Sequence, residues 1–87
     1  MSAQFRWDPD KDDKLRRERG VGYEELLDGN FVGIVGHSTR IHQTLMLIEY
    51  DGYIWVVPYV REGEVRFLKT AYPSRKYTKL YLQGERP

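Results

Sequence analysis

The residues of this chain that are best suited to chemistry lie in one stretch of its last third. Residues 65–79 contain no acidic side chain, and they interleave five cations with three aromatic rings. These side chains are Arg66, Lys69, Arg75, Lys76 and Lys79, with Phe67, Tyr72 and Tyr77 among them. Cationic groups bind phosphates, and an aromatic ring offers a face to an unstacked base. The stretch therefore favours contact with single-stranded nucleic acid; the alternative is a half-exposed strand followed by a solvated helix.

A second candidate group lies upstream, where the sequence has no clear helix or strand pattern. His37 and His42 flank a segment that contains Arg40. Histidine is the usual acid–base residue near neutral pH. If this loop lies beside the last strand, the two histidines are candidates for proton transfer and Arg40 is a candidate contact to RNA. The alternative is an ordinary surface loop.

Length and composition exclude several classes of protein. A chain of 87 residues forms one domain, residues 1–87, with a single small core. Without cysteine there is no disulfide, no thiol nucleophile and no cysteine zinc site, and with only two histidines we expect neither metal nor cofactor. No apolar run reaches the ~18–20 residues of a membrane span, and residues 1–10 lack a secretory pattern. We therefore expect a cytoplasmic protein without membrane contact.

Charge is distributed unevenly along the chain. Residues 60–87 carry seven Lys and Arg against three Asp and Glu, a net charge of +4, whereas residues 1–30 have a net charge of −2. The overall net charge of +1 hides this difference. A cationic C-terminal third suits a polyanionic partner.

Two helices are predicted near the N-terminus, after a short strand at residues 4–7. Asp8 and Pro9 are typical of a helix start, acidic residues follow in the first turn and basic ones in the last, and Gly20 ends the helix. A second helix fits residues 23–28, with Gly22 as N-cap and Glu25 at the third position. Trp7, just before the first helix, is expected to anchor the core.

The middle of the chain predicts an antiparallel meander. Its strands cover residues 31–35, 43–50, 53–60 and 64–70, with turns at Asp51–Gly52 and Glu62–Gly63, and a last helix covers about residues 75–82. Pro58 lacks a donor, so we expect a bulge or an unpaired side there. The expected class is α+β: two N-terminal helices on an antiparallel meander, with a short C-terminal helix.

The two central strands are apolar on both faces, so the sheet needs two covers. The first two helices have few apolar residues and cover one face. The other face meets the C-terminal helix, through Leu80 and Leu82, or else a second copy or a different protein.

Three segments together resemble one protein family. They are Phe5–Lys11 with Trp7, Asp8 and Pro9, then Arg19–Glu25 with Gly20, Val21 and Tyr23, and finally Val65–Leu68 before Ala71. These motifs and the order of the predicted elements resemble BrnT-type toxins, which are RelE-like ribonucleases of bacterial type II toxin–antitoxin pairs. The resemblance spans about residues 4–80.

The sequence also departs from the family pattern in three places. Lys69–Arg75 stands where the family usually has Ser-Ala-Arg, the common Glu-Arg entry to the central strand is replaced near Ile41–His42, and Gly22 replaces a serine N-cap. The first two departures lie in the region where the resemblance implies the active site.

The resemblance implies an RNA-cleaving toxin that inhibits growth, is neutralised by a ribbon-helix-helix antitoxin and forms a hetero-oligomer with it. Metal-free RNA cleavage needs a base, an acid and cations for the extra phosphate charge. Arg66 and Arg75 are candidate phosphate clamps, Lys69 is a candidate acid or base, and Tyr72 could stack or donate a proton. Lys76, Tyr77 and Lys79 are further candidate RNA contacts. We expect these groups to converge on one phosphodiester.

Two other functions remain open from the sequence. One is a non-catalytic RNA- or protein-binding module on the same fold, motivated by the departures between Lys69 and Arg75. The other is a structural homodimer that uses the second apolar face of the sheet.

Overall fold

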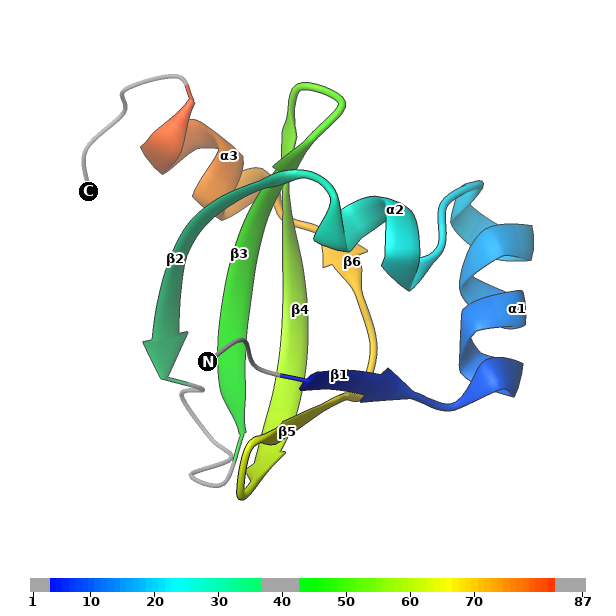
Figure 1. Cartoon of the computed structure of the whole chain (residues 1–87). Helices are drawn as coiled ribbons and strands as arrows, with labels where there is room; N and C mark the ends of the chain where they lie inside the picture. Colours follow the sequence, from blue (N-terminus) through cyan, green and yellow to red (C-terminus); the bar gives the residue numbers. More distant parts are fainter. Residues whose placement is uncertain (1–3, 37–42, 83–87) are drawn as a thin grey trace.

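The computed structural model describes residues 4–36 and 43–82, which form a mixed α+β domain (Figure 1). Its helices are α1 (Pro9–Arg19), α2 (Tyr23–Leu27) and α3 (Arg75–Tyr81). Its strands are β1 (Gln4–Trp7), β2 (Asn30–Gly36), β3 (Thr44–Tyr50), β4 (Tyr53–Glu62), β5 (Val65–Leu68) and β6 (Tyr72–Pro73). The α+β class agrees with the prediction.

All six strands belong to one sheet. Its order is β1-β5-β4-β3-β2, and β6 pairs with β4 beyond the end of β5. Strands β2 to β5 are antiparallel neighbours in chain order, as the meander pattern predicts, whereas β1 lies parallel to β5 at the far edge. The sheet therefore joins the two ends of the chain, because β1 and β5 come from opposite ends of the sequence (Figure 1).

The predicted helix signals around α1 are present in the structure. The Asp8 carboxylate accepts a hydrogen bond of 2.9 Å from the Asp10 N–H, and Gly20 ends the helix with a φ of 74°. Leu15 is the one α1 residue buried in the core. The helix is therefore weakly anchored by apolar contact and depends on polar contacts with its neighbours.

One face of the sheet is covered by α1 and α2. Leu15 and Leu26 pack there against Met46, Trp55 and Leu68 from three strands. Trp7 packs against the same core, with its ring centroid 5.5 Å from that of Tyr23, so the prediction of a core role is confirmed.

The opposite face is covered by α3. Leu45, Leu47, Ile54 and Val56 are buried there, and Tyr77 from α3 packs against them. Of the alternatives left open by the sequence, the C-terminal helix is the cover observed on this face, although Tyr77 takes the place expected for Leu80 and Leu82 in that core.

A hydroxyl group fixes α3 to the sheet. Thr78 is 4% exposed; its Oγ1 accepts a hydrogen bond of 2.9 Å from the Ile54 N–H and donates one of 2.6 Å to the Ser74 carbonyl. The Ser74 N–H in turn donates to the Ile54 carbonyl at 2.8 Å. The N–H and the carbonyl of Ile54 thus both find partners on the side of β4 that faces away from β3.

Pro58 determines where β5 ends. The register of β4 continues through Pro58 without a bulge, so the bulge alternative is wrong and the unpaired side is the observed outcome. The Lys69 N–H donates to the Pro58 carbonyl at 2.8 Å, but proline has no N–H to return. The strand stops at Leu68, earlier than the predicted Thr70, and β4 pairs next with β6.

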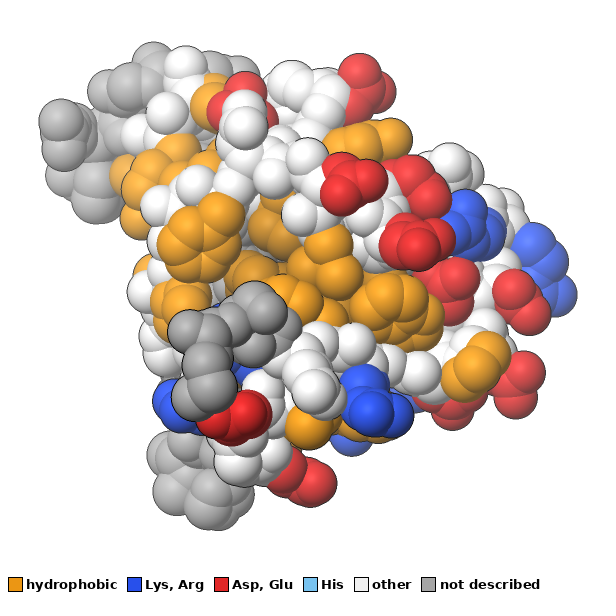
Figure 2. Space-filling view, viewed as in Figure 1, with side chains coloured by type: hydrophobic (Ala, Val, Ile, Leu, Met, Phe, Trp, Pro, Cys, Tyr) orange, Lys and Arg blue, Asp and Glu red, His pale blue; other side chains and the backbone are white. Residues whose placement is uncertain are grey.

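The open apolar surface lies at β2, which is an edge strand. Phe31 is 61% exposed and Ile34 46% exposed, and their register partners Ile48 and Met46 belong to the core under α1 and α2. Figure 2 shows hydrophobic side chains continuing across this face between β2 and the helices. The uncovered apolar area is therefore beside α2, and not on the face where the sequence pattern suggests it.

Candidate nucleic-acid interface

Two arginines lie directly opposite each other on neighbouring strands. Arg61 of β4 is the register partner of Arg66 of β5. In an antiparallel ladder, hydrogen-bonded residue pairs alternate with non-hydrogen-bonded pairs. Lys69 and Pro58, three pairs away, are hydrogen-bonded, so Arg61 and Arg66 form a non-hydrogen-bonded pair, with Cα atoms about 4.5 Å apart. Like charges at directly opposite positions destabilise a sheet. The Arg61 side chain is held at the turn between the two strands, where its Nε donates a hydrogen bond of 3.1 Å to the Gly63 carbonyl.

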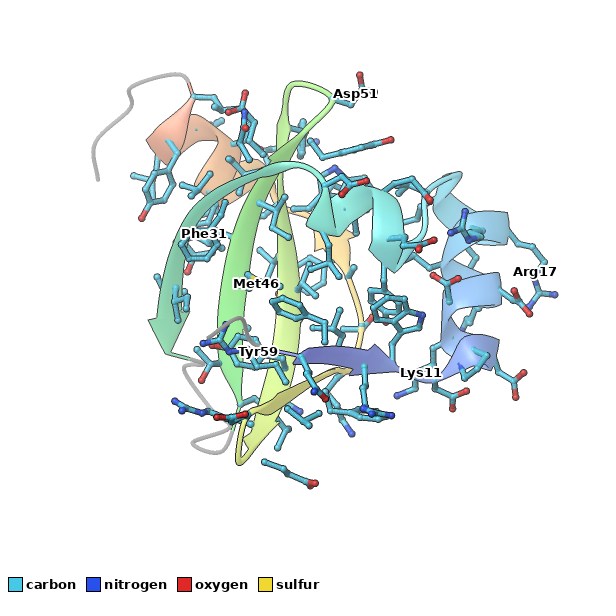
Figure 3. The ribbon with its side chains drawn as sticks, viewed as in Figure 1. Lys11, Arg17, Phe31, Met46, Asp51 and Tyr59 are labelled. Atoms are coloured by element: carbon cyan, nitrogen blue, oxygen red, sulfur yellow. The ribbon has the colours of Figure 1, made fainter. Side chains whose placement is uncertain are left out.

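Aromatic rings hold Arg66 in place. Its guanidinium carbon lies 5.9 Å from the centroid of the Phe5 ring and 5.7 Å from that of the Tyr59 ring. Both rings belong to the face covered by α1 and α2, so Arg66 lies on that face (Figure 3 labels Tyr59). Among the described residues Arg66 pairs with no carboxylate, and its donors remain available for an anion.

Lys69 lies on the other side of the sheet. Its ammonium is 5.2 Å from the centroid of the Phe67 ring. Phe67 is the register partner of Val60, which alternates with Tyr59 and Arg61 and therefore faces α3. Arg66 and Lys69 thus point to opposite faces, and they do not hold the same phosphate.

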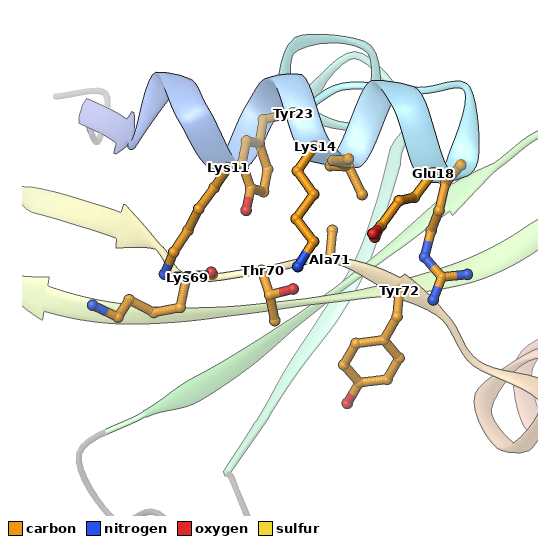
Figure 4. Close-up of a pocket in the computed structure, with 10 residues that line it drawn as sticks. Lys11, Lys14, Glu18, Tyr23, Lys69, Thr70, Ala71 and Tyr72 are labelled. Carbon is orange, nitrogen blue, oxygen red and sulfur yellow. Dashed lines mark hydrogen bonds between the residues drawn. The ribbon is translucent and has the colours of Figure 1, made fainter.

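The Lys69 backbone is tied to α1. Its carbonyl receives no hydrogen bond from residue 58, because proline has no N–H. It accepts instead a hydrogen bond of 3.3 Å from the ammonium of Lys11. This contact closes one end of a cleft of about 500 Å³ between α1 and residues 69–72. The cleft is lined by Lys11, Lys14, Leu15, Glu18, Arg19, Tyr23, Lys69, Thr70, Ala71 and Tyr72 (Figure 4).

Tyr23 is the tyrosine buried in that wall. Burial raises the pKa of its hydroxyl above the ordinary value, and the carboxylates of Asp12 and Asp8 raise it further. A phenol with a raised pKa stays protonated at neutral pH. Tyr23 is therefore a structural part of the cleft and does not serve as a base.

The remaining predicted residues lie on or next to α3. Tyr72 in β6 pairs with Val56, which belongs to the α3 face, and is 38% exposed. Arg75 is the first residue of α3 and is exposed. Lys76 lies with its ammonium 5.3 Å from the Tyr77 ring centroid, and Lys79 is also exposed on this helix.

The prediction that all these cations converge on one phosphodiester is wrong. The last helix is anchored at Ile54, whereas Arg66 lies opposite Arg61, seven residues further along β4. Seven residues of strand span about 23 Å. The physical reason is that β5 ends after four residues and the chain then crosses to the other end of β4, so the charges separate.

His37, Arg40 and His42 lie outside the described residues, and their candidate roles remain predictions from residue type.

Sequence reasoning missed Arg61 and the cations of α1. Arg61 could have been found by counting back from the turn, because Glu62 pairs with Val65 and the next rung joins Arg61 to Arg66. Lys11, Lys14 and Arg19 carry no such signal, because only the folded chain brings α1 beside residues 69–72.

Two features are absent from the described residues, 4–36 and 43–82. Within them, no helix has the length and hydropathy needed to cross a membrane. Nor do three or more His, Asp or Glu side chains gather there in a way that could hold a metal ion.

Comparison with known proteins yields a structural match. Neither a protein-family model nor a curated protein sequence matches the chain. Among solved structures, the Brucella abortus ribonuclease toxin BrnT superposes with a TM-score of 0.56 and 15% sequence identity, covering 84% of this chain and 97% of the toxin. The match covers nearly the whole of the toxin. This chain therefore has the fold of the BrnT ribonuclease toxin.

Proposed function

We propose that this chain is the toxin of a bacterial toxin–antitoxin pair and cleaves RNA without a metal ion. The observation that carries the proposal is the rung of two arginines on a BrnT-like sheet. In this reaction the ribose 2′-oxygen attacks phosphorus, the bond to the 5′-oxygen breaks, and the phosphate gains charge in the transition state. Arg61 and Arg66 are placed to stabilise that charge.

The two protons of the reaction need other groups. One proton leaves the 2′-hydroxyl and one reaches the departing 5′-oxygen, and neither arginine deprotonates in a protein. We assign the transfer to His37 and His42 on their residue type. Lys69, Tyr72 and Arg75 then contact the RNA away from the reacting phosphate, as do Lys76, Tyr77, Lys79 and Arg40.

The test compares variants of the two arginines with a matched control. Arg66→Ala and Arg61→Ala should each lower kcat for RNA cleavage by about 100-fold, because each removes a donor to the charged transition state. Arg17→Ala is the control, since Arg17 is exposed on the outer side of α1 (Figure 3). Purified protein is incubated with single-stranded RNA, with and without EDTA.

Each outcome decides the proposal. Cleavage that survives EDTA and Arg17→Ala but not Arg66→Ala supports it. Intact RNA with the wild-type chain, together with unimpaired growth on expression, overturns it. Cleavage unaffected by either arginine variant overturns the assignment of the site.

A non-catalytic RNA-binding module is the second candidate function. It is favoured by the described contacts of Arg66, which are with the Phe5 and Tyr59 rings and, across the rung, with Arg61, and which include no ion pair with a carboxylate. RNA affinity that falls steeply with salt, without cleavage products, would select this function.

We further propose that an antitoxin, expected to be of the ribbon-helix-helix type, covers the apolar surface at β2. That surface lies on the same face of the sheet as Arg66, so an occupant of it would obstruct the access of RNA to the two arginines. A hetero-oligomer with the antitoxin is expected on this basis.

A further inference from the structure

The cations of α1 differ in how they are neutralised. On the outer side of the helix, Arg16 forms ion pairs with Asp12 at 3.1 Å and with Glu25 at 2.8 Å, and the Arg17 side chain donates to the Asp13 carbonyl at 3.4 Å. On the cleft side, the side chains of Lys14 and Arg19 make no hydrogen bond or ion pair within the described part of the chain. The charge of α1 is thus compensated on one side only.

The cleft concentrates this uncompensated charge. Lys11, Lys14 and Arg19 line it against the single carboxylate of Glu18, whereas Lys69 contributes its backbone carbonyl and directs its ammonium to the other face of the sheet. Figure 4 shows the side chains of Lys11 and Lys14 extending from α1 toward residues 69–71, so the cations of the cleft come from the α1 wall. Three cations and one anion around a space of about 500 Å³ make an anion-binding cleft.

One cation of the cleft is positioned by the backbone. The Lys69 carbonyl lacks a strand partner because residue 58 is proline, and it accepts the hydrogen bond from Lys11. An ammonium has three donors, so two remain for a ligand at the mouth of the cleft. The site is therefore organised before any ligand binds.

The lining also indicates which part of a ligand would bind. Figure 4 shows the Tyr72 ring directed away from α1, and Tyr23 is 1% exposed. The cleft thus provides charges without an accessible aromatic platform, and it recognises phosphate groups better than bases.

We propose that the cleft between α1 and residues 69–72 binds a backbone phosphate of single-stranded RNA, apart from the phosphate that is cleaved. The inference rests on the proposed function for its choice of RNA over other phosphate compounds. Arg66 and Lys69 are three residues apart at one edge of the sheet, about 10 Å along the strand, so one RNA strand can reach both. The cleft then holds the substrate, and the arginine rung acts on it.

The test measures binding without cleavage. The probe is a single-stranded 2′-O-methyl oligoribonucleotide, which lacks the attacking hydroxyl, and its affinity for the full chain is measured by fluorescence anisotropy at several salt concentrations. The double substitution Lys14→Gln with Arg19→Gln should weaken binding at least tenfold. It should also reduce the slope of log K against log salt by about 1.4, at about 0.7 for each cation removed from a single-strand contact. Because both side chains are exposed, the melting temperature should not change.

Arg17→Gln and Asp13→Asn are the matched controls on the outer side of α1. The first removes a cation and the second an acid, so neither should weaken binding by more than about twofold if the cleft is the site. Equal losses from Arg17→Gln and from the cleft variant would show a non-specific charge effect and overturn the proposal.

Competing ligands distinguish the sources of phosphate. Pyrophosphate and ATP are added to the labelled complex, and millimolar concentrations should be needed to displace it. Displacement at micromolar concentration by either compound would overturn the assignment to RNA. Undiminished binding in the cleft double variant would overturn the site itself.

Failure of this inference and failure of the proposed function give different results. If the chain binds the probe through the cleft but never cleaves RNA, the inference stands and the enzyme is rejected. If the enzyme cleaves RNA and the cleft variant changes neither KM nor probe affinity, the inference alone is rejected. If both hold, the cleft variant raises KM with kcat within about twofold, whereas Arg66→Ala lowers kcat.

Discussion

At the scale of single residues, polar side chains of this chain differ in what they contribute to the fold. Arg61 and Arg66 occupy directly opposite positions of two strands, an arrangement of like charges that generally disfavours a sheet. Thr78, by contrast, satisfies two backbone positions with one hydroxyl and is buried. Both residue types are polar, so composition alone does not distinguish the roles.

Thr78→Val should destabilise the domain by about 1–3 kcal/mol, because it leaves the buried Ile54 N–H without an acceptor. The free energy of unfolding is measured by urea titration. Thr78→Ser keeps the hydroxyl and should recover most of the loss. A valine variant as stable as the wild type would show that α3 is not fixed by this hydrogen bond.

At the scale of elements, the junctions between helices and strands are tightly defined. A Cβ atom at Gly29, between α2 and β2, would lie 2.6 Å from the Glu49 carbonyl oxygen and 2.8 Å from an Ile48 methyl carbon. A Cβ atom at Gly33, in the middle of β2, would meet nothing within 4 Å. Two glycines four residues apart thus have different structural demands.

Gly29→Ala should destabilise the fold by about 1–3 kcal/mol, since backbone must move to admit the methyl group. Gly33→Ala is the matched control and should stay within about 0.5 kcal/mol of the wild type. Thermal and urea unfolding of the two variants provide the comparison. Equal stability of both variants would contradict the close packing at the α2–β2 junction.

The α1–α2 junction predicts a pH dependence. The Gly22 N–H donates to the Glu25 carboxylate at 2.8 Å, and this bond, with a further contribution from Arg16, lowers the pKa of Glu25 below its usual 4.5. A lowered folded-state pKa means that the ionised form is favoured by folding. The stabilisation is therefore complete above about pH 4.5 and is lost as the pH falls through the lower folded-state value.

Glu25→Gln tests this dependence, because the amide oxygen can still accept from Gly22 but carries no charge. Urea midpoints measured at pH 7 and pH 3 should show the wild type more stable than the variant at pH 7. The difference should shrink at pH 3. A constant difference across this range would contradict the role of the Glu25 charge.

Local sequence patterns predict the helices, their caps and the hairpins well. Asp8, Pro9 and Gly20 act through neighbouring backbone, so their effect can be read without the fold. Such local patterns do not predict which strand pairs with β1, nor do they predict the two-residue strand β6, because both depend on contacts between segments that are distant in the sequence. The assignment of Arg66 and Lys69 to one site has a different cause. The two residues are three apart in the predicted strand, so alternation alone already implies opposite faces, as the structure shows.

At the scale of the whole molecule, the sheet has one face that is open at its β2 edge. Phe31 and Ile34 are exposed there, and no charged residue occurs between Phe31 and Gly36. An uncharged edge strand invites pairing with another chain. The proposed antitoxin is the occupant that would also obstruct the arginine rung.

Phe31→Asp should leave the melting temperature nearly unchanged, since the side chain is largely exposed, but weaken antitoxin binding at least tenfold. The chain is co-expressed with the product of the adjacent reading frame, and affinity is measured by calorimetry. Tyr81→Asp is the control, because Tyr81 is 49% exposed on α3. The assignment would be contradicted if Tyr81→Asp alone lost antitoxin binding. It would also be contradicted if light scattering showed a homodimer of the wild type that Phe31→Asp converts to monomers.

The continuity of strand β4 through Pro58 has one more consequence. Since β5 pairs with residues 59–62 and β6 with residues 55–56, one continuous strand sets the position of two separate segments on the same edge. Sliding β4 by a single residue would displace the arginine rung, the lysine-lined cleft and the seat of α3 together. Binding and anchoring are thus aligned by a common strand, so a substitution that alters its register should impair both at once.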